Sequence, residues 1–81
     1  MSGEKYVLIG AGSAMFTRGL VVDLLQSEQA SEIALVDIDP HALEVVERLS
    51  RKMVAAKRVA LKVSASVDRR DVLPGANVVI S

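Results

Sequence analysis

One stretch near the N-terminus constrains the fold more than any other. The apolar run at residues 6–9 is followed at once by "GAG" at 10–12, and a helical pattern begins near residue 14. A run that is apolar at every position is typical of a strand buried on both faces, as in a parallel sheet covered by helices. Because a helix follows this strand across a tight turn, the stretch predicts the opening β-α unit of an α/β domain.

The alternation of strand and helix patterns continues along the chain. We expect strands at 5–9, 32–36, about 60–66 and 77–81, helices at about 14–28 and 40–57, and a turn-rich segment at 67–76. This β-α-β-α-β-β order predicts a Rossmann-like parallel sheet with flanking helices, the N-terminal half of a doubly wound α/β domain. The first two strands are expected at its centre. The third alternates apolar and polar residues, which favours an edge.

The second helix has the clearest start signal. Asp39 can accept hydrogen bonds from the free amides of the first turn, and Pro40 stands at the first helical position, where no donor is needed. Its apolar side is expected to consist of Ala42, Val46, Leu49, Met53 and Ala56. The charged residues fall largely on the other side, and we interpret them as a solvated surface.

Charge and cysteine content exclude several functions. Ten Lys and Arg balance ten Asp and Glu, and Tyr6 and Phe16 are the only aromatic residues, so the sequence predicts no nucleic-acid partner. No run approaches the ~20 apolar residues that span a bilayer, and the first apolar run is too short for a signal peptide. Cysteine is absent, which excludes disulfides and thiolate metal sites within these residues. We expect a cytoplasmic protein without membrane contact.

The glycine turn predicts an anion site. A strand, a tight turn and a helix start bring together free backbone amides and the positive end of the helix dipole. Gly10 permits the turn, Gly12 lets a pyrophosphate approach the backbone, and Ser13 adds a hydroxyl donor or caps the helix. Met15 stands where the motif G-x-G-x-x-G has its third glycine, and this larger residue argues against close packing of the helix on the strand at that point. Gly19, one turn later, is expected to restore part of that packing. The alternative is an ordinary strand-to-helix turn.

An acidic residue ends the second strand. At Asp37, a carboxylate can accept both ribose hydroxyls of the adenosine half of a dinucleotide. It lies somewhat further from Gly10 than the usual ~20 residues, and a longer first helix and loop absorb the difference. Because the carboxylate would repel a 2′-phosphate and no Arg or Lys follows it closely, the sequence favours NAD over NADP. We assign Asp39 to helix capping.

Three further residues carry weaker signals. His41 is the single histidine and has no partner at metal-site spacing, so we predict no metal site within this chain. Arg69 and Arg70 lie in the turn-rich segment, where we interpret both as solvated. A contact with adenine or phosphate is the alternative for them.

Three segments of the chain carry a family resemblance: "IGAGSAMFTRGLVVDLL", "ALVDIDPHALEVVERL" and "DRRDVLPGANVVIS". In this order and spacing they resemble the N-terminal region of glycoside hydrolase family 4, which contains alpha-glucosidases, alpha-galactosidases, alpha-glucuronidases and 6-phospho-glycosidases. The resemblance covers essentially the whole chain, and Met15 is in keeping with the segment G-A-G-S-x-x-F-T of that family. It implies a pyrophosphate turn and a ribose carboxylate formed by Gly10, Gly12, Ser13, Met15, Phe16 and Asp37.

The resemblance also implies an unusual glycosidase chemistry. Members of this family bind NAD and a divalent metal, commonly manganese. NAD⁺ takes a hydride from the sugar C3, a tyrosine base removes the C2 proton while the metal stabilises the enolate, the aglycone leaves, water adds, and the hydride returns. The metal ligands and the base are expected beyond residue 81, so no catalytic or metal-binding residue is assigned here. The chain alone is expected to be inactive.

We expect residues 1–81 to form one partial NAD-binding domain whose catalytic and metal-binding remainder is absent from this chain. The chain ends within the apolar run "VVIS" with no following helix, which favours part of a larger protein. In full-length form we expect a homo-oligomer that acts on a small glycoside. Two alternatives stay open: the cofactor domain of a NAD-dependent dehydrogenase, and a non-catalytic nucleotide-binding or assembly module.

Overall fold

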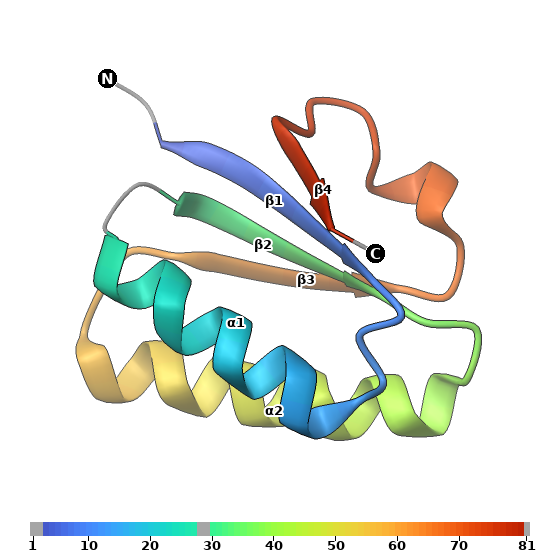
Figure 1. Ribbon diagram of the computed structural model, residues 1–81, viewed down its shortest axis with the longest axis horizontal. Helices are drawn as coiled ribbons and strands as arrows, with labels where there is room; N and C mark the ends of the chain where they lie inside the picture. The colour runs from blue at the N-terminus through green and yellow to red at the C-terminus, as the bar shows by residue number, and fades with distance from the viewer. Residues whose placement is uncertain (1–2, 28–29, 81) are drawn as a thin grey trace.

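The computed structural model describes residues 3–27 and 30–80. Its elements in chain order are β1 (Glu4–Ile9), α1 (Ala14–Ser27), β2 (Ala30–Val36), α2 (Pro40–Lys57), β3 (Lys62–Ser66), the 3-10 turn η1 (Arg69–Asp71) and β4 (Val78–Ile80). All strands pair in parallel, in the order β3-β2-β1-β4 (Figure 1). The predicted Rossmann-like class is confirmed, with β1 and β2 central and β3 at an edge.

Strand boundaries follow backbone pairing more closely than the apolar pattern. β2 begins at Ala30, earlier than expected, because this residue already pairs with Glu4. β3 begins at Lys62, later than expected, where pairing with Glu32 starts. The expected ends of the first helix at residue 28 and of the last strand at residue 81 lie outside the described residues.

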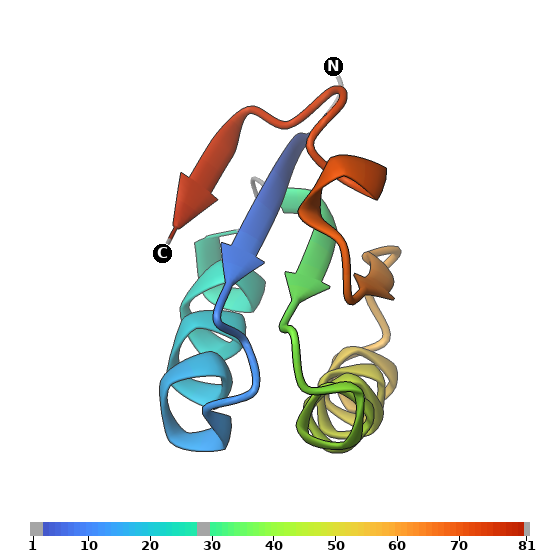
Figure 2. The same ribbon diagram turned by 90° about the vertical axis from the view of Figure 1, so that its right-hand side faces the viewer.

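Both helices cover one face of the sheet, and the η1 segment lies on the other (Figures 1 and 2). The cause is the handedness of crossover connections between parallel strands, which is almost always right-handed. The chain steps in one direction from β1 to β2 to β3, so α1 and α2 lie on the same face. It then returns past β1 to reach β4, so this connection must cross the opposite face.

Successive residues of the central strands contribute to two separate cores. The core under the helices contains Leu8, Ile33 and Leu35. The core under the η1 segment contains Val7, Ala34, Val36 and Val72. This period of two explains why the second halves of β1 and β2, residues 6–9 and 33–36, are apolar at every position, since both faces of the sheet are covered there.

The buried side of α2 is rotated from the predicted one. Its buried residues are Leu43, Val46, Ser50 and Val54. The prediction is confirmed for Val46 and wrong for Ala56, which is exposed, while Ala42, Leu49 and Met53 lie half-buried at the margin. The helix packs against α1 as well as against the sheet, so two neighbours set its buried side.

The start of α2 agrees with its sequence signal. The Asp39 carboxylate accepts hydrogen bonds from the backbone N–H groups of His41 and Ala42 at 3.0 and 3.3 Å, and Pro40 is the first helical residue. The helix ends at Lys57, and the capping residue Arg58 that follows has a left-handed φ of 55°. Within residues 3–27 and 30–80, no helix is long and apolar enough to cross a bilayer.

Candidate functional site

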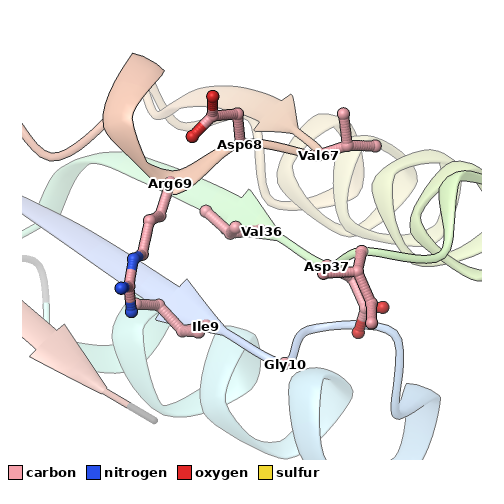
Figure 3. Close-up of a pocket in the computed structure, with 8 residues that line it drawn as sticks. Ile9, Gly10, Val36, Asp37, Val67, Asp68 and Arg69 are labelled. Carbon is pink, nitrogen blue, oxygen red and sulfur yellow. The ribbon is translucent and has the colours of Figure 1, made fainter.

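A cleft opens at the carboxyl ends of β1 and β2. It has a volume of about 510 Å³ and is lined by Ile9, Gly10, Val36, Asp37, Ile38, Val67, Asp68 and Arg69 (Figure 3). The turns that follow β1, β2 and β3 meet there. Ligands of open parallel sheets bind outside the carboxyl ends of the strands where the strand order reverses. In this sheet the order reverses at β1, beside the cleft.

The glycine turn is tied to the end of β2. The backbone N–H groups of Gly10 and Ala11 both donate to the Val36 carbonyl oxygen, at 2.8 and 2.9 Å. Gly10 has a φ of +82°, a left-handed conformation that glycine adopts without steric cost. The turn is thereby fixed at the cleft, and α1 begins directly after it.

The first turn of α1 offers free backbone donors. Its first internal hydrogen bond runs from the Thr17 N–H to the Ser13 carbonyl oxygen at 3.0 Å. The N–H groups of Ala14, Met15 and Phe16 therefore have no partner within the helix. Together with the helix dipole, they form the kind of site that binds an anion.

Close packing of α1 on the turn comes from Thr17, a residue that the sequence interpretation missed. It is buried, and its hydroxyl donates to the Ala11 carbonyl oxygen at 2.7 Å. Met15 is 90% exposed, so its size does not separate helix and strand. The expectation for Gly19 was wrong, because this residue is exposed and no atom lies within 4 Å of where its Cβ would stand.

Asp37 lies against the glycine turn. Its Oδ1 accepts the Asp39 N–H at 2.9 Å, and its Oδ2 accepts the Gly12 N–H at 2.8 Å. These two hydrogen bonds, the one from Asp39 foremost, lower the pKa of Asp37 below its ordinary value. Each carboxylate oxygen can accept about two hydrogen bonds. The charged group is therefore held in place with capacity left for two further donors.

Other predicted positions have simpler environments. Ser13 is exposed immediately before α1, and its carbonyl oxygen accepts the first helical hydrogen bond. Phe16 is 44% exposed on the first turn of the helix. His41 is exposed on α2. Among the described residues, no group of three or more His, Cys, Asp or Glu side chains could hold a metal ion.

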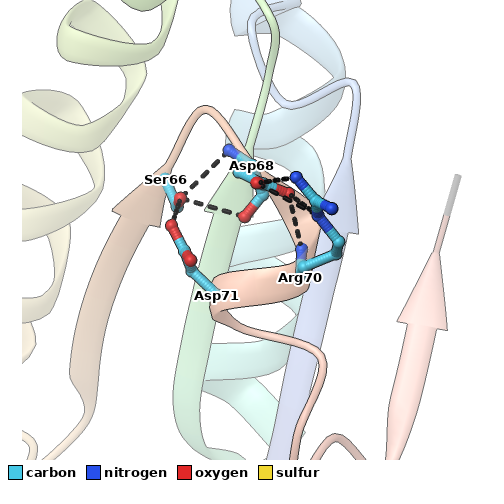
Figure 4. A network of polar contacts seen from close by, with 4 residues as sticks. All are labelled: Ser66, Asp68, Arg70 and Asp71. Carbon is cyan, nitrogen blue, oxygen red and sulfur yellow. Dashed lines mark hydrogen bonds and ion pairs between the residues drawn. The ribbon is translucent and has the colours of Figure 1, made fainter.

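The adjacent arginines after β3 have different environments. The Asp68 carboxylate holds the Arg70 side chain through hydrogen bonds of 2.8 to 3.2 Å, which lower the pKa of Asp68 (Figure 4). The Ser66 hydroxyl donates to Asp71 at 2.7 Å and completes this network. Arg69 instead extends across the cleft toward Ile9 (Figure 3). Among the described residues, no ion pair engages its guanidinium.

The sequence matches known proteins along nearly its whole length. A family model described as "Family 4 glycosyl hydrolase" matches residues 5–81. An alpha-glucosidase of Erwinia rhapontici is 46% identical over 78 residues, which are 94% of this chain and 17% of the relative. An alpha-galactosidase of Rhizobium meliloti (strain 1021) is 35% identical over 83 residues, which cover 100% of this chain and 17% of the relative.

A solved structure shares the fold. It is a 6-phospho-alpha-glucosidase from gut microorganisms in complex with NAD and Mn²⁺, with a TM-score of 0.85 and 15% sequence identity. The match covers 96% of this chain and 18% of that protein. The chain therefore spans less than a fifth of the length of the relatives that it matches.

Proposed function

The chain belongs to the family 4 glycosyl hydrolases, as its sequence resemblance predicts, and we propose that it is the NAD-binding N-terminal region of a glycosidase that hydrolyses O-glycosidic bonds. One observation carries this proposal. A charged carboxylate, Asp37, is held by two backbone amides at the carboxyl end of a central strand, directly beside a glycine turn and a helix start. That is the arrangement that a dinucleotide requires.

The adenosine and pyrophosphate parts of the dinucleotide have complementary groups in the cleft or at the adjoining start of α1. The free first-turn amides of α1 would bind the pyrophosphate, and Asp37 would accept hydrogen bonds from the two ribose hydroxyls. Ile38 and Val67 are 90% and 52% exposed at the cleft. These apolar side chains would cover the adenine, and this contact gives a reason for their exposure.

We propose NAD rather than NADP as the cofactor. The Asp37 carboxylate would repel a 2′-phosphate, since both groups carry negative charge. Arg69 lines the same cleft with a charge of the opposite sign, a proximity that sequence spacing alone did not reveal. The preference for NAD is therefore best tested by measuring the binding of both NAD⁺ and NADP⁺.

The proposed reaction is the redox elimination that the family resemblance implies. Bound NAD⁺ would supply the acceptor for a hydride from the sugar C3, and the residues of this chain would bind and orient it. Tyr6 is unsuited to be the base, because its hydroxyl donates to Glu4 at 3.0 Å, which is the main reason that its pKa is raised. The tyrosine base and the ligands of a divalent metal, proposed to be manganese, would belong to the rest of the full-length protein.

The expectations about substrate, oligomeric state and location remain predictions. We further propose a sugar-containing substrate, a homo-oligomeric full-length protein and a cytoplasmic location. The family match favours a glycosidase over a dehydrogenase of another family. The proposed site residues remain Gly10, Gly12, Ser13, Met15, Phe16 and Asp37.

A calorimetric titration with NAD⁺, and separately with NADP⁺, tests this function. We expect saturable NAD⁺ binding and much weaker NADP⁺ binding by the folded chain. The Asp37→Ala variant should bind NAD⁺ roughly ten- to a hundredfold more weakly, as expected for hydrogen bonds lost from a charged group. A folded chain that does not bind NAD⁺, or a variant that binds it as tightly as the original, would contradict the proposal.

A further inference from the structure

A neighbouring side chain fills the space beside Gly12. A Cβ built on this residue would lie 2.6 Å from Asp37 Oδ2, 2.9 Å from Asp37 Cγ and 3.0 Å from Ala42 Cβ. Contacts below 3.0 Å are essentially never made by a real Cβ atom. By contrast, no atom lies within 4 Å of the corresponding point on Gly10 or Gly19. At residue 12, a side chain is therefore excluded by Asp37.

The arrangement around Gly12 also determines what would move if a side chain were added. Ala42 belongs to the first turn of α2, which is anchored by its cap, whereas the Asp37 carboxylate ends a rotatable side chain. A methyl group on residue 12 would therefore displace the carboxylate. The hydrogen bond of 2.8 Å from the Gly12 N–H to Asp37 would then be lost.

We propose that Gly12 is a positioning residue for Asp37: without a side chain, it lets the carboxylate seat against the turn in the orientation that receives the ribose hydroxyls. This differs from the role that the sequence pattern predicts, which is room for a pyrophosphate. The Gly12 N–H is already bonded to Asp37, so the phosphates would be left to the first-turn amides of α1. The binding of ribose hydroxyls by Asp37 rests on the proposed function. The position of the Asp37 carboxylate against Gly12 does not depend on it.

The seating can be tested without any cofactor. In the Gly12→Ala variant, we expect the pKa of Asp37, followed by the NMR shift of its carboxyl carbon during a pH titration, to rise toward its ordinary value of about 3.9. Gly19→Ala is the matched control, since the same methyl group meets nothing there, and it should leave this pKa unchanged. A Gly12→Ala variant with an unchanged Asp37 pKa would overturn the proposal.

A double-mutant cycle on NAD⁺ affinity tests the consequence for binding. Gly12→Ala should weaken NAD⁺ binding in the original chain but have little further effect in the Asp37→Ala chain, because the displaced group is then absent. Equal losses in both backgrounds would show that the methyl group obstructs the phosphates directly, and would overturn the proposal.

The outcomes separate this proposal from the proposed function. A raised Asp37 pKa together with no NAD⁺ binding by the original chain would reject the proposed function and retain the positioning role. If Gly12→Ala alone fails to fold, the proposal expects Gly12→Ala combined with Asp37→Ala to recover the fold. If Gly12→Ala fails to fold both alone and combined with Asp37→Ala, the contact of the added methyl group with Ala42 would account for the loss, and the proposal would be overturned.

Discussion

At the scale of single residues, the cleft combines two opposite charges from different parts of the chain. Asp37 is held by backbone amides on the side of the glycine turn, and Arg69 reaches in from the turn after β3. Asp68 stands next to Arg69 in sequence, but its carboxylate is bonded to Arg70. The charge of Arg69 is therefore available for an anionic part of a ligand.

Arg69→Ala should weaken NAD⁺ binding by up to about fivefold, because an exposed charge pair contributes up to about 1 kcal/mol. The loss should be larger at low salt than at high salt, since salt screens exposed charges. Arg48→Ala is the matched control, because this side chain is 72% exposed on α2 and its guanidinium pairs with Glu44. Titrations that give the two variants the same affinity would contradict a role for Arg69. Arg70→Ala is less suitable, because it would release Asp68 beside Arg69.

At the scale of elements, the first turn of α2 connects helix stability to the cleft. The Asp39 side chain caps the helix, while the Asp39 backbone N–H donates to Asp37. One residue thus stabilises the helix start and helps to fix the Asp37 carboxylate. The exposed pairs further along α2, Glu44–Arg48 and Glu47–Arg51, contribute only about 0.3–0.5 kcal/mol each.

Asp39→Ala should lower the free energy of unfolding by about 1 kcal/mol, the usual cost of removing a capping side chain. Asp39→Asn should lose much less, because an amide oxygen can still accept from the first-turn N–H groups. Both variants keep the backbone N–H that bonds Asp37, so NAD⁺ affinity should change little. Urea unfolding monitored by circular dichroism measures the stabilities. Equal destabilisation by Ala and Asn would argue against the cap.

At the scale of the whole molecule, the two faces of the sheet are covered unequally. Two helices pack on one face, whereas the other is covered by the connection between β3 and β4 (Figure 2). That connection contributes Val72, which is 7% exposed, to the second core. The same connection carries Arg69 into the cleft, so packing of the second face also positions part of the site.

Val72→Ala should destabilise the fold by about 1.5 kcal/mol, from about 0.8 kcal/mol for each buried methylene equivalent removed. Val45→Ala is the matched control, because the Val45 side chain lies 54% exposed on α2 and its removal should cost little. Thermal or urea unfolding of both variants measures the difference. A loss no greater for Val72 than for Val45 would mean that the second core does not contribute to stability.

The sequence by itself determined the elements, their order and part of the candidate site, because the signals for these are local. An apolar run predicts a buried strand, and the Asp39-Pro40 pair predicts a helix start within a single turn. Asp37 could also be placed beside the glycine turn, since the carboxyl ends of neighbouring parallel strands share one edge of the sheet. These local signals were enough to predict the Rossmann-like class, without any knowledge of which distant residues contact one another.

Only the tertiary structure decided which groups meet across that edge. The seating of Asp37 on Gly12 and the approach of Arg69 depend on strand order and on the face that each connection crosses. The buried side of α2 likewise depends on contact with α1. Periodicity shows that a helix has a buried side, but its neighbours in space decide where that side points. Such contacts join residues far apart in the chain, and no local pattern records them.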